Sequence, residues 1–209
     1  MKKGTFIVFE GGEGSGKTRH ASALAEYLRN EGYDVLETHE PGGSEVGKVI
    51  RKAILYENKH SVFPRTELFL FLADRAQHVE EVIRPALEEG KVVLCDRFSG
   101  STFAYQLGGR ELRETELIQE MDAYARNGLD PDMVLYLDID PETGIQRKEE
   151  GPEELNRMDK EELEFHKKVR VYFLKLAEEN DNWEILSTDG PKEENEEKII
   201  DLIMNQIKK

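Results

Sequence analysis

Residues 6–18 read FIVFEGGEGSGKT, and this stretch decides the fold. The apolar run at 6–9 predicts a buried strand, and a helical pattern begins at Lys17. Between them, residues 11–18 satisfy the pattern G-x-x-x-x-G-K-[ST], in which successive backbone N–H groups wrap around phosphates at a helix N-terminus. The stretch therefore predicts a phosphate-binding P-loop. A flexible glycine-rich turn between strand and helix is the alternative.

The residue types within this loop suit a nucleoside triphosphate such as ATP. Glycines let the backbone approach the phosphates closely. Lys17 is expected to bridge the β- and γ-phosphates, and the Thr18 hydroxyl to ligate Mg²⁺. The expected ATP-binding residues are Gly11, Gly12, Glu13, Gly14, Ser15, Gly16, Lys17 and Thr18.

Outside the loop, short apolar runs alternate with longer helical patterns. Near-continuous apolar strands separated by helices indicate a parallel sheet covered on both faces. With no repeat and no dividing linker, we expect residues 1–209 to form a single α/β domain, a doubly wound five-stranded parallel sheet with helices on both faces. Strands are predicted at 6–9, 35–36, 92–95, 133–137 and 183–186, and helices at 17–30, 44–55, 64–89, 113–127, 141–149, 160–179 and 192–208.

Charge and composition exclude several classes of protein. The formal net charge of −15 argues against a nucleic acid polymer as partner, whereas a small anion needs only a local cluster of donors. No apolar run approaches the ~20 residues that cross a membrane. Lone Cys95 excludes an internal disulfide, and the N-terminus carries no signal-peptide pattern. We therefore expect a cytoplasmic protein.

A P-loop alone leaves kinases, GTPases and motor ATPases open. GTPases read their base with N-K-x-D, and the nearest approach, NKHS at 58–61, lacks the aspartate. Asp96 and Arg97 directly follow the strand at 92–95, at the sheet edge where α/β proteins place ligands. Asp96 is expected to hold Mg²⁺ through water, and Arg97 to span the donor and acceptor phosphates. These features favour a kinase, with a surface ion pair as the alternative for this dipeptide.

Four further segments complete a recognisable set: EPGGS at 40–44, Arg51, FLADRAQ at 71–77 and STFAYQ at 101–106. Together with FEGGEG at 9–14 they closely resemble the thymidylate kinase (dTMP kinase) family, in order from about residue 6 to residue 176. The resemblance implies phosphorylation of dTMP to dTDP with ATP and Mg²⁺, in dTTP biosynthesis. It also implies a homodimer packed through helices.

The resemblance assigns roles at the thymine base. Phe71 would stack on the ring, and Arg75 would donate to its O4. Thr102 and Gln106 would line the base edge, while Tyr105 would pack on the sugar and exclude a 2′-hydroxyl. An aromatic face suits a base, and an arginine donor prefers a keto oxygen to an amine. Taken alone, Phe71 is more commonly a core residue, whereas Arg75 beside so apolar a stretch needs a partner.

Further roles concern the sugar and the phosphates. The resemblance implies that Glu13 accepts a hydrogen bond from the 3′-hydroxyl and that Glu40 and Asp96 organise Mg²⁺ and its waters. The metal set is therefore Thr18, Asp96 and Glu40, partly through water. The expected dTMP-binding residues are Glu13, Glu40, Pro41, Arg51, Phe71, Arg75, Arg97, Ser101, Thr102, Tyr105 and Gln106.

Phosphoryl transfer needs positive charge on the transferred group. Some thymidylate kinases place an arginine within the P-loop, and others bring it from a closing lid. Positions 12–15 contain no arginine, which favours a lid at about 147–158 with Arg147 and Arg157 flanking its acidic stretch. Both arginines could instead solvate that acidic stretch. The expected catalytic set is Lys17, Asp96, Arg97, Arg147 and Arg157.

Two other functions stay open at this point. One is a related kinase that acts on a different nucleoside or nucleotide. The other is a nucleotide-dependent switch that binds both substrates without transfer. Four histidines belong to no catalytic constellation and are interpreted as surface residues: His20, His60, His78 and His166.

Overall fold

The computed structural model describes residues 4–55, 62–152 and 154–208. Residues 58–61, which contain the NKHS sequence and His60, lie outside the described residues, as does Glu153 of the expected lid. Within the described parts of the chain, no helix is both long enough and apolar enough to span a membrane.

The core of the fold is a sheet of five parallel strands in the order β2-β3-β1-β4-β5, which confirms the predicted fold class. The strands are β1 (Thr5–Gly11), β2 (Val35–His39), β3 (Val92–Asp96), β4 (Met133–Asp138) and β5 (Trp183–Ser187). β1 lies at the centre and pairs with both β3 and β4. Phe9 is in register with Asp96. The P-loop after β1 and the Asp-Arg pair at the end of β3 therefore lie side by side.

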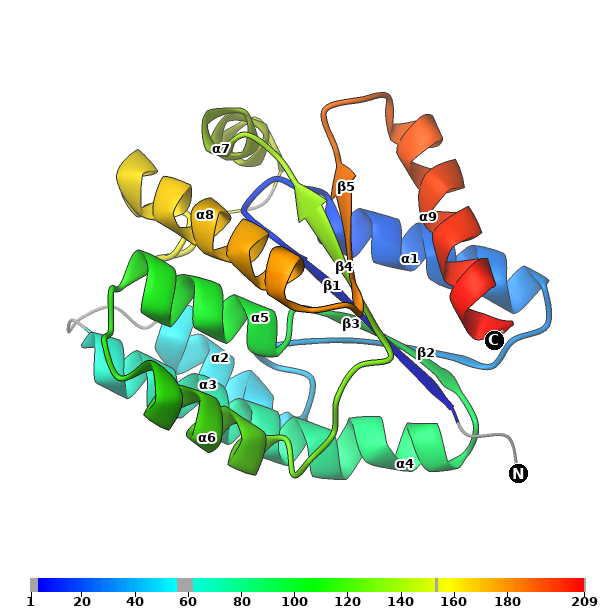
Figure 1. The fold of residues 1–209 in the computed structure, drawn as a ribbon, viewed down its shortest axis with the longest axis horizontal. Coiled ribbons are helices and arrows are strands. Elements are labelled where there is room, and N and C mark those ends of the chain that lie inside the picture. Colours follow the sequence, from blue (N-terminus) through cyan, green and yellow to red (C-terminus); the bar gives the residue numbers. More distant parts are fainter. Residues whose placement is uncertain (1–3, 56–61, 153, 209) are drawn as a thin grey trace.

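Helices cover both faces of this sheet (Figure 1). On one face, α1 (Lys17–Asn30) and α9 (Lys192–Ile207) pack against Ile7 and Phe9 of β1. The neighbouring residues Phe6 and Val8 point to the opposite face, where they pack with the second helical layer. Successive side chains of a strand point to opposite faces, so the continuous apolar run of β1 serves both layers.

The second layer contains most of the remaining helices. These are α2 (Glu45–Leu55), α3 (Pro64–His78), α4 (Arg84–Glu88), α5 (Ser99–Thr102), α6 (Thr115–Ala125) and α8 (Leu163–Glu179), while α7 (Pro141–Glu149) lies beyond the carboxyl ends of the strands (Figure 1). The predicted helix at 64–89 is continuous, with a π-helical turn, η1 (Val79–Ile83), between α3 and α4.

One helical segment was not predicted from the sequence. Residues 99–109 form α5 followed by the π-helical turn η2 (Phe103–Gly109). Three glycines and three serine or threonine residues in this segment give it a weak intrinsic helix propensity. Tertiary packing decides its conformation instead, because Ala104 and Tyr105 are buried against Phe165 and Phe173 of α8.

Candidate active site

The P-loop occupies the turn between β1 and α1. Gly14 and Gly16 adopt left-handed backbone angles, with φ of 68° and 85°, and a Cβ on Gly14 would lie 2.0 Å from the Gly144 carbonyl oxygen. Lys17 donates from Nζ to the Gly12 carbonyl at 2.8 Å. Burial, and then the nearby Arg97, lower the pKa of Lys17 to about 8. The loop therefore holds a buried ammonium group over its own backbone.

Two oxygen ligands suitable for Mg²⁺ lie next to this loop. Thr18 donates from Oγ1 to Asp96 Oδ2 at 2.5 Å, and Asp96 Oδ1 is buried with no hydrogen-bond partner among the described residues. No group of three acidic, histidine or cysteine side chains that could hold a metal occurs in the described parts of the chain. This set fits Mg²⁺, which takes one or two protein ligands and completes its shell with phosphates and water.

Arg97 joins the P-loop to the segment that follows β3. Its backbone has a positive φ of 71°, which is uncommon for a residue other than glycine. Its guanidinium donates to the Gly11 carbonyl at 3.0 Å, to Ser101 Oγ at 3.2 Å and to Glu13 Oε1 at 2.8 Å. Three acceptors thus fix this cation beside the phosphate loop.

Glu13 is the carboxylate that holds this cluster together. Its Oε1 also accepts a hydrogen bond from the Tyr105 hydroxyl at 2.7 Å, and the Arg97 guanidinium lies 5.2 Å from the Tyr105 ring centre. Burial alone would raise the pKa of Glu13, but Arg97 and Lys17 outweigh it and lower that pKa to about 2. Glu13 is therefore ionised at neutral pH.

Glu10 is a functional residue that the sequence analysis missed. This fully buried carboxylate accepts from the backbone N–H groups of Phe98 and Ser101 at 2.9 Å each, and from the Ser101 hydroxyl at 2.5 Å. Ser101 in turn accepts from Arg97. A Cβ on Gly100 would lie 2.8 Å from Glu10 Oε1. Glu10 therefore fixes the turn that carries Arg97, and a lone glutamate inside an apolar strand is the signal that could have revealed it.

The buried position of Glu10 leads to a pH-dependent prediction. Burial raises the pKa of Glu10 to about 7, from about 4.5 in the unfolded chain. The stability linked to its protonated form is complete below about pH 4.5 and is lost as the pH rises through about 7. Glutamine at this position cannot ionise. We therefore expect the free energy of unfolding of Glu10→Gln to rise relative to that of wild type by on the order of 2–3 kcal/mol between pH 5 and pH 8. Urea unfolding of both proteins at pH 5 and at pH 8 measures this rise. If the variant and the wild type differ in unfolding free energy by the same amount at both pH values, the prediction is contradicted.

The expected base-recognition residues lie around Arg75, whose side chain is almost fully buried. Its guanidinium donates to Glu40 Oε2 at 3.0 and 2.7 Å, to Thr102 Oγ1 at 2.9 Å and to Asp122 Oδ1 at 2.6 Å. The prediction that Arg75 needs partners is confirmed. Asp122 was not identified from the sequence, because nothing in its own helix marks it as the partner of a residue 47 positions away.

Glu40 has buried partners that the sequence did not predict. The sequence places it among the metal ligands, whereas its Oε2 accepts from Arg75 and its Oε1 lies 3.0 Å from Nδ1 of His78. Both oxygens are thus engaged within the buried network. Glu40 therefore also positions Arg75, since a buried guanidinium requires a compensating carboxylate, and its role at the metal stays a prediction.

A continuous cavity of about 1140 Å³ joins these groups. It runs from the P-loop to the Arg75 network along the carboxyl edge of the sheet. Expected site residues that line it are Glu13, Gly14, Ser15, Gly16, Lys17, Thr18, Glu40, Pro41, Arg51, Phe71, Arg75, Asp96, Arg97, Ser101, Thr102, Tyr105, Gln106 and Arg147.

The two lid arginines differ in position. Arg147 of α7 lines the cavity and donates to the Thr188 carbonyl at 3.2 Å. Arg157 does not line it. Instead Arg157 donates to the Ile54 carbonyl at 3.1 Å and forms an ion pair with buried Glu67. The structure therefore places Arg147, but not Arg157, on the lining of the cavity, because the Glu67 carboxylate holds the second arginine elsewhere.

The sequence predicted no role for the residues at one end of the cavity. Beside the P-loop it is lined by Arg19, Thr188, Gly190, Lys192 and Asn195. Thr188 and Gly190 lie just after β5, at the carboxyl edge of the sheet, and that position is the signal that could have identified them.

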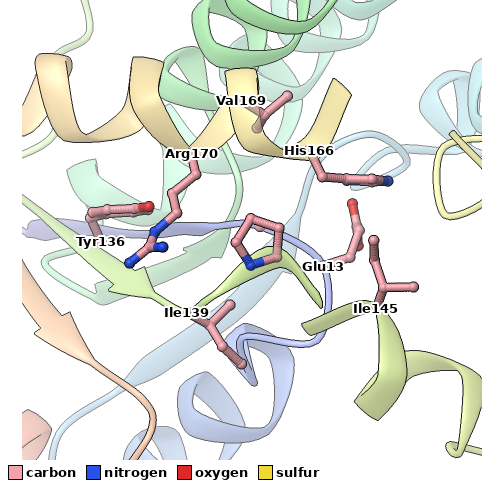
Figure 2. Close-up of a pocket in the computed structure, with 9 residues that line it drawn as sticks. Glu13, Tyr136, Ile139, Ile145, His166, Val169 and Arg170 are labelled. Atoms are coloured by element: carbon pink, nitrogen blue, oxygen red, sulfur yellow. The ribbon is translucent and has the colours of Figure 1, made fainter. Parts of the chain in front are cut away.

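The interpretation of His20, His78 and His166 as surface residues is wrong, since they are 4%, 0% and 5% exposed. Figure 2 shows that the His166 ring of α8 and the Glu13 side chain of the P-loop point toward one another beside a small internal cavity of about 10 Å³. That cavity is too small for a substrate.

A P-loop next to an aspartate and a fixed arginine, joined by one cavity to the buried Arg75 network, defines a P-loop phosphotransferase of the nucleotide-kinase type. The family model described as thymidylate kinase matches residues 9–199, and the chain belongs to this family. It therefore phosphorylates dTMP with ATP.

Individual relatives agree with this assignment. A thymidylate kinase from Desulfovibrio desulfuricans is 45% identical over 196 residues, which cover 90% of each chain. A thymidylate kinase from a Geobacillus species is 42% identical over 207 residues, with 98% of each chain covered. The crystal structure of thymidylate kinase from Ehrlichia chaffeensis superposes with a TM-score of 0.79 at 28% identity, covering 97% of this chain and 99% of that one.

Proposed function

We propose that ATP and dTMP bind at opposite ends of the large cavity and that the γ-phosphoryl group passes directly between them with Mg²⁺. An oxygen of the dTMP phosphate attacks the γ-phosphorus, the bond to the β–γ bridging oxygen breaks, and ADP leaves with that electron pair. The observation that carries this proposal is the continuity of the cavity from Lys17 to Phe71. One shared space lets both substrates meet without an enzyme-bound intermediate.

At the base end, the unused hydrogen-bonding capacity matches thymine. Hydrogen bonds to the described residues account for four of the five N–H groups of Arg75, so one remains for the thymine O4. Gln106 Oε1 is buried without a partner among the described residues, and thymine N3–H supplies the donor it lacks. Phe71 stacks on the ring, and Tyr105 packs against the sugar.

At the phosphate end, the cations have separate roles in this proposal. Lys17 and Arg97 stabilise the charge on the transferred group, while Arg51 binds the acceptor phosphate from beside Pro41, whose carbonyl it contacts at 2.7 Å. Thr18 and Asp96 would hold Mg²⁺, and the ion would neutralise charge on the phosphate oxygens. Closure of the lid at about 147–158 would bring in Arg147, while Arg157 would first have to leave Glu67.

Phe71→Ala tests the base site. Stacking of a base on an aromatic ring contributes about 1–3 kcal/mol, so we expect the KM for dTMP to rise roughly 5- to 150-fold while the KM for ATP is unchanged. Phe69→Ala is the matched control, because Phe69 lies on the same helix but is 59% exposed. Steady-state kinetics with each substrate varied measure the effect. An equal change in both KM values would remove Phe71 from the base site.

We also propose that two copies of the chain form a homodimer. The support is the exposure of apolar Val46 and Val49 on α2, 50% and 69% exposed, since helices with exposed apolar residues are common at subunit interfaces. Sedimentation equilibrium of the pure protein measures this, and a monomeric mass at micromolar concentration contradicts it.

A further inference from the structure

Glu67 is a carboxylate at the back of the base pocket to which the reaction assigns no role. It lies on α3 and is fully buried. Three side chains donate to it: Gln106 from Nε2 at 2.8 Å, Arg110 from Nε at 3.1 Å and Nη2 at 3.3 Å, and Arg157. Two cations therefore hold one ionised carboxylate against the amide of a single glutamine.

The position of Glu67 is fixed further by second contacts of these arginines. Arg110 also donates to Glu161 at 2.6 Å, and its guanidinium lies 4.6 Å from the Phe165 ring centre. Arg157 also donates to the Ile54 carbonyl at 3.1 Å. Because each arginine contacts a second group besides Glu67, the arginines and the carboxylate lose little conformational freedom when a ligand binds. The carboxylate is therefore preorganised.

This contact determines which way the amide of Gln106 faces. An ionised carboxylate only accepts hydrogen bonds, whereas an amide carries an acceptor oxygen and a donor nitrogen. Gln106 must therefore present its NH₂ group to Glu67, which directs its oxygen away from Glu67. That oxygen, Oε1, is buried without a partner among the described residues, and the side chain lines the cavity.

An acceptor fixed in this way distinguishes the pyrimidine bases. Thymine and uracil carry a hydrogen on N3, whereas N3 of cytosine is itself an acceptor. A site built to accept a hydrogen bond rejects a ligand that lacks the donor, because two buried acceptors then face one another.

We propose that Glu67 is a positioning residue that sets base selectivity by fixing the amide orientation of Gln106. This inference rests on the proposed placement of the base beside Gln106. Glu67 itself need not touch the substrate.

The test is the ratio of kcat/KM for dTMP to kcat/KM for dCMP in the full-length Glu67→Gln variant. Glutamine at 67 offers either an oxygen or an NH₂ group, so the Gln106 amide is free to turn. We expect the ratio to fall about tenfold or more. Arg75 still disfavours the 4-amino group of cytosine, so some selectivity remains. The dTMP to dUMP ratio should not change, because both bases carry N3–H.

A control variant separates this effect from a general loss of charge or stability. Glu161→Gln removes another carboxylate from Arg110 but does not disturb the bond between Glu67 and Gln106. We expect it to keep the wild-type dTMP to dCMP ratio. A ratio of activities within one variant is independent of the amount of folded enzyme, so simple destabilisation would leave it unchanged.

The inference is overturned if the dTMP to dCMP ratio of Glu67→Gln stays within twofold of the wild-type ratio while Gln106→Leu still raises the KM for dTMP. In that case the proposed base site beside Gln106 stands, and only the role of Glu67 is lost. If Gln106→Leu leaves that KM unchanged, the base site is misplaced and the inference falls with it. Should Glu67→Gln fail to fold, Glu67→Asp decides, because it keeps the charge but draws the carboxylate back by one methylene. A smaller fall in the ratio supports the inference, and an unchanged ratio overturns it.

Discussion

Replacing Arg97 with alanine is expected to lower kcat by about 10³-fold or more. Cations fixed on the transferred phosphoryl group contribute on this scale, because they stabilise charge without having to reorganise during the reaction. Arg97 is fixed by Gly11, Glu13 and Ser101. Its loss also leaves Glu13 without its closest cation. Single-turnover rates at saturating ATP and dTMP measure the effect on the chemical step.

Two further variants define the cause of this loss. Arg97→Lys keeps the charge but loses the forked geometry, so its rate should lie between those of the wild type and the alanine variant. Arg65→Ala removes an exposed arginine that pairs with Glu114 on the surface, and it should leave kcat unchanged. An Arg97→Ala enzyme with kcat within tenfold of wild type would show that Arg97 has no catalytic role.

Replacing Arg75 with methionine is expected to lower the free energy of unfolding by about 3–5 kcal/mol. Arg75 is buried with Glu40 and Asp122, and removing one partner of a buried ion pair leaves uncompensated charge in the interior. Its guanidinium also lies 4.9 Å from the Phe98 ring centre, a contact that methionine does not reproduce. Urea unfolding monitored by circular dichroism measures the change, with the slope of the unfolding free energy against urea concentration the same in both proteins.

Arg126→Met is the matched control for this prediction. Arg126 also pairs with Asp122 at 2.9 Å, but its side chain is 20% exposed, so water compensates for part of its loss. We expect a cost of about 1 kcal/mol. If the free energy of unfolding falls equally in the two variants, the buried ion pairs of Arg75 do not stabilise the fold more than the partly exposed pair of Arg126 does.

The sequence predicted the sheet well because its strongest signals are local. The apolar run at 6–9 and the glycine-rich stretch after it define β1 and the P-loop without reference to any other part of the chain. Strands at 92–95 and 133–137 carry the same continuous apolar pattern. The helix at 99–109 was missed because its conformation depends on packing against α8 and on Glu10.

The site was predicted less completely, and the reason is sequence separation. Motif resemblance identified many of the residues that line the cavity, including Arg75 and Gln106. The residues that hold these groups in place were not identified. Glu10 contacts Ser101 across 91 positions, and Glu67 contacts Gln106 across 39. An isolated glutamate in a strand or helix does not reveal which distant donor it will meet.

The most direct test of the account is acceptor preference in a coupled ADP-release assay with ATP, Mg²⁺ and a panel of dTMP, dUMP, dCMP, dGMP, AMP and thymidine. We expect strong turnover with dTMP, weaker turnover with dUMP and little with the others, with dTDP as the product. Faster turnover with any other acceptor, or binding of ATP and dTMP without release of ADP, would contradict it.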